Sequence, residues 1–159
     1  MFEAAFNALT SLPASFSQLA SLETLLLAHN ALTSVAPLAP LANLASVTLD
    51  ANALTSLEDM GLARKPRLAL LSVRGNKLAS LPAEIGDCAL LAQLLARGNA
   101  LRDVPFELCG LKKLRELELE ENPLDDPKIK KMMLKPASFV KEARLKRKRV
   151  LTERARLIC

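Results

Sequence analysis

The sequence has few aromatic residues and few of the side chains on which metal binding and acid–base catalysis usually depend. Aromatic residues make up 3% of its 159 positions, tryptophan and tyrosine are absent, and His29 is the single histidine. A core must therefore consist of leucine, valine, isoleucine and alanine, and a site built on two histidines is excluded. No glycine-rich loop that could hold a phosphate is present. We expect no enzyme activity and no cofactor, and we interpret His29 as a polar residue at the end of a strand.

The cysteines and the apolar runs exclude further classes of protein. Cys88, Cys109 and Cys159 lack the spacing of metal ligands, and an odd number of cysteines cannot all pair in disulfides. Reduced thiols indicate a cytoplasmic location. No targeting segment is visible at the N-terminus, and no uninterrupted apolar run is long enough to cross a membrane. We therefore expect a cytoplasmic protein without a membrane span, in which Cys88 and Cys109 are small core residues.

What the sequence does contain is a repeat marked by asparagine. Six asparagines are separated by 23, 22, 24, 23 and 23 residues: Asn7, Asn30, Asn52, Asn76, Asn99 and Asn122. Each is followed two positions later by leucine, and apolar residues precede it at fixed offsets, as Leu22, Leu25 and Leu27 precede Asn30. The unit is LxxLxLxxNxL. Because one such unit cannot bury its apolar face alone, several must stack around a shared core.

Each half of the unit has its own predicted structure. We interpret LxL as a short strand with both leucines pointing inward, and we expect the asparagine amide to bond backbone groups that have no strand partner. The second half returns along the outer side, as in residues 80–91, with Leu81, Ile85 and Cys88 inward.

The repeat resembles that of leucine-rich repeat proteins, in particular the intracellular class with about 23 residues per repeat. Leu12-Pro13, Leu81-Pro82 and Val104-Pro105 match the LP or VP that follows the Asn-x-Leu turn in this class. The resemblance covers residues 2 to about 134. It implies an α/β leucine-rich repeat solenoid, with a curved parallel sheet on the concave face and irregular or short helical return segments.

A fainter resemblance concerns residues 86–103 and 122–133. The sequences of these two segments are similar to the repeats of a leucine-rich repeat protein that carries a tRNA-synthetase-type B3/B4 domain. The present chain contains no such domain.

Some repeats depart from the pattern. Ala96 and Ala4 replace the second strand leucine, which predicts thinner packing there. The third repeat is one residue longer across residues 57–68, and we expect a bulge on its outer face. The first repeat is truncated and presents an uncapped apolar edge at Phe2. Either another chain covers this edge or the sequence is a fragment, and we favour the fragment.

Charge divides the chain into an acidic body and a basic tail. Residues 1–127 hold 10 Lys/Arg and 15 Asp/Glu, and residues 128–159 hold 12 and 2, so the net charges are −5 and +10. We predict a leucine-rich repeat domain over 1–134, with about six repeats and a helical cap at 125–134. A basic C-terminal helix follows over 135–159.

The repeat also predicts which side chains line the solvent side of the sheet, because strand side chains alternate. Residues two and four positions before each asparagine point outward. We regard the resulting concave face as a protein-binding site with exposed leucines and with a basic Arg74/Arg97 pair between acidic ends. The alternative is that its apolar residues are incidental. The candidate residues are Leu26, Thr48, Asp50, Leu70, Ser72, Arg74, Leu95, Arg97, Glu118 and Glu120.

The basic tail suggests a polyanionic partner. RNA, bound without sequence specificity, and an acidic protein surface both fit; an anionic membrane surface or a solvated helix with no partner are the alternatives. We therefore expect a non-catalytic interaction scaffold or adaptor. The other candidate is an RNA- or ribosome-associated protein that uses the tail. The candidate tail residues are Lys141, Arg144, Lys146, Arg147, Lys148, Arg149, Arg154 and Arg156.

Overall fold

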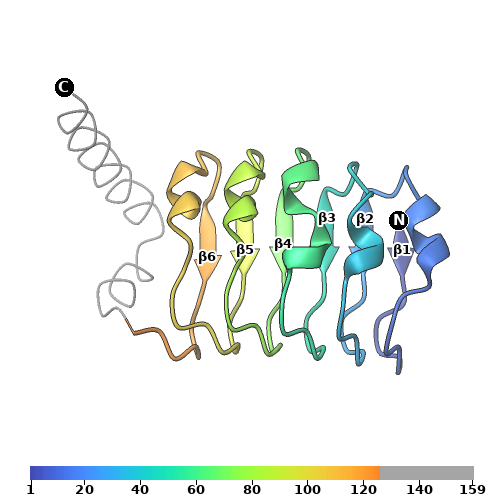
Figure 1. The fold of residues 1–159 in the computed structure, drawn as a ribbon, viewed down its shortest axis with the longest axis horizontal. Helices are drawn as coiled ribbons and strands as arrows, with labels where there is room; N and C mark the ends of the chain where they lie inside the picture. The colour runs from blue at the N-terminus through green and yellow to red at the C-terminus, as the bar shows by residue number, and fades with distance from the viewer. Residues whose placement is uncertain (126–159) are drawn as a thin grey trace.

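The structure is a computed structural model that describes residues 1–125. Within them, six short strands form one parallel sheet in sequence order (Figure 1). This order arises because every return segment leads the chain to a strand beside the one it has just left, which is the predicted arrangement of stacked coils. The strands are β1 (Phe2–Glu3), β2 (Thr24–Leu26), β3 (Ser46–Thr48), β4 (Leu70–Ser72), β5 (Gln93–Leu95) and β6 (Glu116–Glu118).

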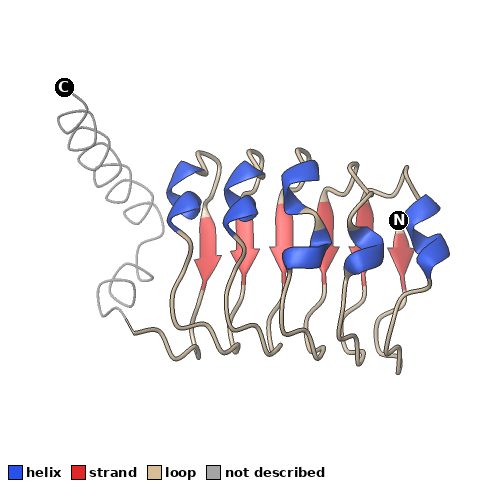
Figure 2. Cartoon of the chain, viewed as in Figure 1, coloured by secondary structure: helices blue, strands red, loops and turns tan. Residues whose placement is uncertain are grey.

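The return segments contain short 3-10 helices, which lie in a layer opposite the sheet (Figure 2). Pro13, Pro82 and Pro105 each stand directly before such a helix, with φ near −65°. Proline fixes this φ and lacks an N–H that would otherwise need a partner, which explains the LP and VP motifs. The helices are η1 (Ala14–Gln18), η2 (Ala36–Leu38), η3 (Glu58–Met60), η4 (Leu62–Arg64), η5 (Ala83–Asp87) and η6 (Phe106–Gly110).

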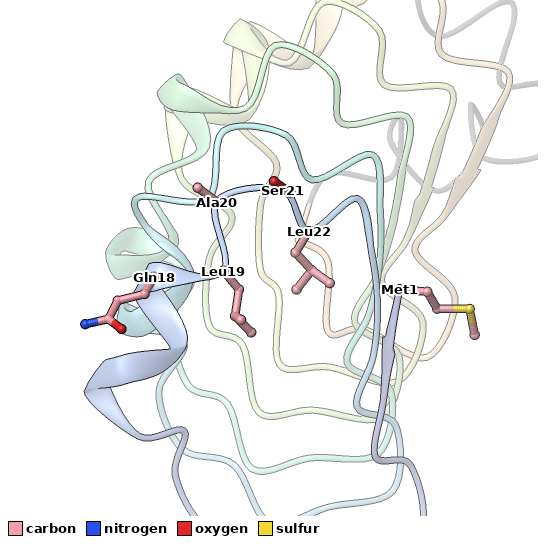
Figure 3. A pocket seen from close by; sticks show the side chains of 6 residues that line it. All are labelled: Met1, Gln18, Leu19, Ala20, Ser21 and Leu22. Carbon is pink, nitrogen blue, oxygen red and sulfur yellow. The ribbon is translucent and has the colours of Figure 1, made fainter.

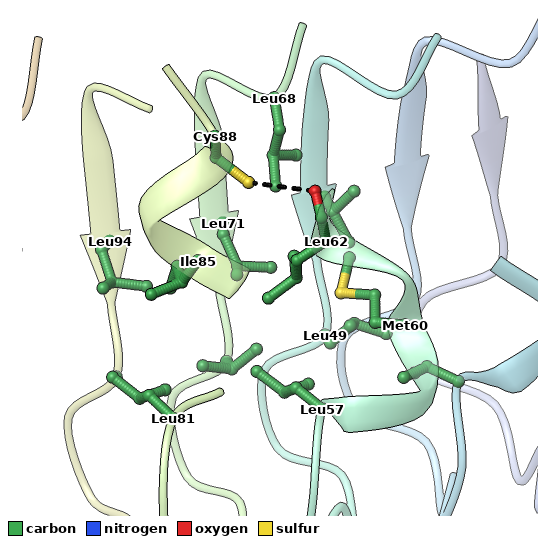
Figure 4. Close-up of a cluster of buried hydrophobic side chains, with 14 of the residues drawn as sticks. Leu49, Leu57, Met60, Leu62, Leu68, Leu71, Leu81, Ile85, Cys88 and Leu94 are labelled. Atoms are coloured by element: carbon green, nitrogen blue, oxygen red, sulfur yellow. Dashed lines mark hydrogen bonds between the residues drawn. The ribbon is translucent and has the colours of Figure 1, made fainter. Parts of the chain in front are cut away.

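The core lies between the sheet and the return segments. Leu25 and Leu27 are both fully buried, which confirms that the two leucines of LxL point inward. Ile85 and Cys88 point into the same core from the return side (Figure 4). Ala96 is also fully buried, so it continues the strand layer with a smaller side chain.

The repeated asparagines join each coil to the one before it. The amide Nδ2 of Asn52 donates to the carbonyl oxygens of Leu27 and Leu49 at 2.9 Å, and its Oδ1 accepts the N–H of Leu32 at 2.9 Å. The same pattern recurs at Asn30, Asn76, Asn99 and Asn122. The predicted role of the amide is confirmed, and each asparagine supplies bonds that a continuing strand would otherwise make.

The residue before each asparagine has a positive φ. Gly75 and Gly98 suit this conformation, but Ala51 and His29 also adopt it, at φ 51° and 55°. A side chain with a Cβ is strained there. His29 therefore lies in the turn that leaves β2, as the sequence predicted, and its ring stacks on Phe6 with centroids 4.3 Å apart.

The third repeat carries the predicted extra outer structure in the form of two helices, η3 and η4, separated by Gly61 at φ 66°. A Cβ on Gly61 would lie 3.0 Å from the carbonyl oxygen of Ala39, so this turn packs closely on the preceding coil.

A buried lysine follows η4, which the sequence analysis did not predict. Lys65 is 0% exposed, and its Nζ donates to the carbonyl oxygens of Leu38 at 2.7 Å, Leu41 at 3.4 Å and Ala39 at 3.5 Å. Its position, eleven residues before Asn76, is the one that Leu41 and other inward residues occupy in their repeats. The carbonyl oxygens replace the water that the amine loses on burial.

The first coil has the predicted apolar edge. Phe6 is 77% exposed and Met1 78%, while Phe2 is partly covered by an edge-to-face contact with Phe16 at 5.0 Å. The predicted cap at 125–134 and basic helix at 135–159 lie, apart from Asp125, outside the described residues.

Candidate functional site

The predicted concave face is built by the register of the sheet. Strand pairing places one outward residue from each strand side by side, so that together they form a lateral row. Neighbours in such a row are about 4.8 Å apart, which is the spacing of paired strands. The row consists of Glu3, Leu26, Thr48, Ser72, Leu95 and Glu118.

The exposure of the concave face differs from the prediction at one leucine. Leu26 and Leu70 are half-buried, but Leu95 is only 6% exposed although it points to the solvent side of the sheet. Ser72, its neighbour in register, is also buried. The expectation that all three leucines are exposed is therefore wrong for Leu95, and its cover must come from neighbouring side chains.

The ion pair of Arg74 indicates the source of that cover. The arginine follows β4, yet its guanidinium forms a two-pronged ion pair with Glu118 of β6, with Nε–Oε2 at 2.8 Å and Nη2–Oε1 at 2.9 Å. The pair must cross β5, and Leu95 is the β5 residue in register with Glu118. The aliphatic stem of arginine readily covers an apolar side chain in this way.

Asp50 borders the same arginine from the opposite side. One carboxylate oxygen of Asp50 accepts the hydroxyl of Ser72 at 2.6 Å and the backbone N–H of Arg74 at 2.8 Å. Its second oxygen lies 3.7 Å from Nη1 of Arg74. The guanidinium is thus placed between carboxylates on β6 and at the end of β3.

These contacts shift the pKa values of the charged groups. The hydrogen bond from Arg74 lowers the pKa of Glu118, and the same bond raises the pKa of Arg74. Arg97 pairs with Glu121, which lowers the pKa of that carboxyl group by the same cause. The two arginines of the predicted basic pair, Arg74 and Arg97, are thus each bound to a glutamate, so they do not present unmatched positive charges.

The face has an uncharged half and a charged half. Within β2 and β3 its outward side chains are neutral, as at Leu26 and Thr48. The part from Asp50, just after β3, to β6 and the turn that follows it holds two arginines and five carboxylates, a net charge of −3. The charged half consists of Asp50, Arg74, Arg97, Glu116, Glu118, Glu120 and Glu121.

Other places in the described chain could also be considered as sites. A hollow of about 420 Å³ at the first coil is lined by residues such as Met1, Leu19 and Leu22, and it contains no charged side chain (Figure 3). In the core, Cys88 donates from Sγ to the carbonyl oxygen of Leu62 at 3.5 Å (Figure 4). Burial raises the pKa of this thiol to about 11, so it is a poor nucleophile.

Within residues 1–125, the acidic and thiol side chains form no cluster suited to a metal ion. The same part of the chain holds no helix that is both long and apolar enough to cross a bilayer. Glu120 lies exposed after β6. The eight predicted tail residues, from Lys141 to Arg156, lie outside the described residues.

Comparison with solved structures identifies the architecture. A leucine-rich repeat protein of Leptospira interrogans superposes with a TM-score of 0.75 at 36% sequence identity, over 82% of this chain and 33% of that one. This chain is a leucine-rich repeat protein. An internalin of Listeria monocytogenes superposes on the leucine-rich repeat array with a TM-score of 0.71 at 21% identity, over 83% of this chain and 38% of that one.

The leucine-rich repeat protein described here spans about a third of the length of the Leptospira structure and 38% of the internalin. No protein-family profile matches it, and no curated protein matches it by sequence. The intracellular subclass and the fainter resemblance to the B3/B4-containing protein stay predictions.

Proposed function

We propose that this leucine-rich repeat protein is a non-catalytic interaction scaffold or adaptor that binds a protein partner on its concave face. The observation that carries the proposal is the lateral row that runs in register across all six described strands. The leucine-rich repeat architecture of both solved neighbours supports a scaffold role in general.

The composition of the concave face suits contact with a protein surface. Leu26 and Leu70 offer partly accessible apolar area, and Thr48 and Asp50 add hydrogen-bonding groups beside them. A face held by strand pairing is already ordered before binding, so a partner does not have to immobilise it. Mixed apolar and polar side chains on a fixed surface are typical of protein interfaces.

A site-specific photo-crosslinker in the full-length chain tests this proposal. Placed at Thr48, it should form covalent adducts with a protein in cells that express the chain. At Glu84, an exposed residue of η5 on the return side, it serves as the control. Leu70→Asp should remove the Thr48 adduct, and a melting curve verifies that the variant is folded. Equal adducts at Thr48 and Glu84 would rule out the concave face as the binding surface.

A second candidate function comes from the charge of the tail. Residues 128–159 carry a net charge of +10, so an RNA- or ribosome-associated protein using this segment is the alternative. Reversing the charge of Lys146, Arg147, Lys148 and Arg149 should then abolish RNA binding. The affinity of the wild-type chain should fall steeply with salt. An acidic protein that competes with RNA for the tail would instead support its role as the second anchor of the adaptor.

A further inference from the structure

Arg74 lies between two carboxylates and its guanidinium forms close hydrogen bonds with only one of them. Glu118 holds its guanidinium through two hydrogen bonds of 2.8 and 2.9 Å, whereas the nearest oxygen of Asp50 is 3.7 Å from Nη1. Asp50 is itself fixed by Ser72 and by the backbone N–H of Arg74. The Asp50 carboxylate is therefore already held in place as a second partner, to which the guanidinium could move from Glu118.

The first position of Arg74 conceals an apolar residue. Leu95 is 6% exposed on β5, the strand that the Arg74–Glu118 pair crosses, while Leu26, at the equivalent place of its repeat, is half-buried. Movement of Arg74 toward Asp50 would uncover Leu95 and free the Glu118 carboxylate beside it. The same movement would thus create an apolar contact and an acidic contact on adjacent strands.

We propose that the concave face recognises a protein segment with adjacent basic and apolar side chains. The basic group pairs with Glu118, the apolar group packs on Leu95, and Arg74 moves to Asp50. This inference rests on the proposed concave-face function. The charge of −3 on this half of the face favours a basic segment over an acidic one.

The exchange is feasible because the ion pair is not deeply buried. The side chains of Arg74 and Glu118 are 38% and 27% exposed. Solvent-accessible pairs contribute little to stability, and Asp50 offers Arg74 a replacement partner. A partner's basic group can therefore replace Arg74 at Glu118 without leaving either carboxylate unmatched.

Two synthetic peptides of 12 residues serve as probes with the full-length protein. One alternates leucine with lysine, and the other has glutamate in place of every lysine. Chemical shifts of Leu95, Glu118 and the Arg74 side-chain N–H report where each peptide binds. The lysine peptide should bind and shift all three residues. Preferential binding of the glutamate peptide to Arg74 would overturn the proposal, because Arg74 would then be an anchor for acidic partners.

Substitutions of two arginines separate the exchange from general charge effects. Arg74→Gln should tighten binding of the lysine peptide by about three- to tenfold, because Glu118 and Leu95 are then available without displacement. Arg97→Gln removes the same charge but leaves the Arg74–Glu118 pair intact, so it should have a smaller effect. Glu118→Gln should weaken binding. Equal effects of both arginine substitutions, or weaker binding by Arg74→Gln, would contradict the exchange. Melting curves of each variant verify the fold.

The outcome also separates this inference from the proposed function. If the crosslinker at Thr48 captures a partner but the lysine peptide does not bind, the concave face is a binding surface and the basic-apolar specificity is wrong. If the crosslinker yields no adduct above the Glu84 control and neither peptide shifts the concave residues, both proposals fail.

Discussion

The buried amine of Lys65 should make stability depend on pH in an unusual direction. Burial lowers the pKa of Lys65 to about 8, from 10.5 in the unfolded chain, and a smaller electrostatic effect of Cys88 opposes this shift. Between pH 8 and 10.5 the unfolded chain therefore holds a proton on Lys65 that the folded chain has lost. The free energy of unfolding then rises with pH, by about 1.4 kcal/mol per pH unit and about 3 kcal/mol over the interval.

Cys88 contributes a change of the opposite sign. Its pKa is raised from 9.0 to about 11, mainly by burial, so the unfolded chain loses a proton from the thiol before the folded chain does. This lowers stability between pH 9 and 11 by an amount on the order of 3 kcal/mol. The wild-type protein should gain about 1.4 kcal/mol between pH 8 and 9 and then remain nearly level up to pH 10.5.

Urea unfolding at a series of pH values can measure the two effects separately. Cys88→Ala should leave the Lys65 effect alone, so that stability rises continuously from pH 8 toward 10. Adding Lys65→Met, which keeps much of the side-chain volume, should remove the rise. If the single variant shows no increase between pH 8 and 10, or the double variant retains it, then Lys65 does not lose its proton near pH 8 in the folded state.

Further predictions concern the repeat itself, and all but the last can be measured by urea unfolding. Leu94→Ala, at a fully buried position of β5, should cost about 2 to 5 kcal/mol, and a loss under half a kilocalorie would refute the assigned register. Asn76→Ala should cost roughly 1 to 3 kcal/mol because buried carbonyl and N–H groups lose their partners; an unchanged stability would mean that water replaces the amide. Gly75→Ala should destabilise by about 1 kcal/mol through its φ of 60°, since the nearest atoms to an added Cβ are 3.8 Å away, and Ala51→Gly should stabilise by a similar amount; the same sign for both would contradict this explanation. Within the repeat array, hydrogen exchange should be fastest in residues 2–20, because β1 is an edge strand of only two residues, both exposed, and uniform protection would exclude a weak first coil.

Much of the fold could be predicted because the same backbone geometry recurs in every coil. The offsets before each asparagine predicted the inward residues of the strands, and the asparagine bonds follow from unmet backbone groups. The positive φ before each asparagine was not predicted, since only Gly75 and Gly98 indicate it in the sequence. At Ala51 and His29 the surrounding hydrogen bonds impose the conformation despite its strain, so residue preference alone does not reveal it.

The contacts of the long charged side chains could not be predicted from the repeat period of the sequence, for a related reason. Alternation indicates where a Cβ points, but the end of an arginine or lysine lies several ångströms further and is placed by groups on other coils. Arg74 reaches across β5 to Glu118, and Lys65 reaches carbonyl oxygens of the preceding coil. Aligning the repeats would have marked Lys65 as an unusual residue at an inward position, whereas the partner of Arg74 depends on residues that do not recur. The side-chain contacts that do not recur therefore distinguish this array from other leucine-rich repeat arrays. Specificity for a partner should be sought at Arg74 and its two carboxylates.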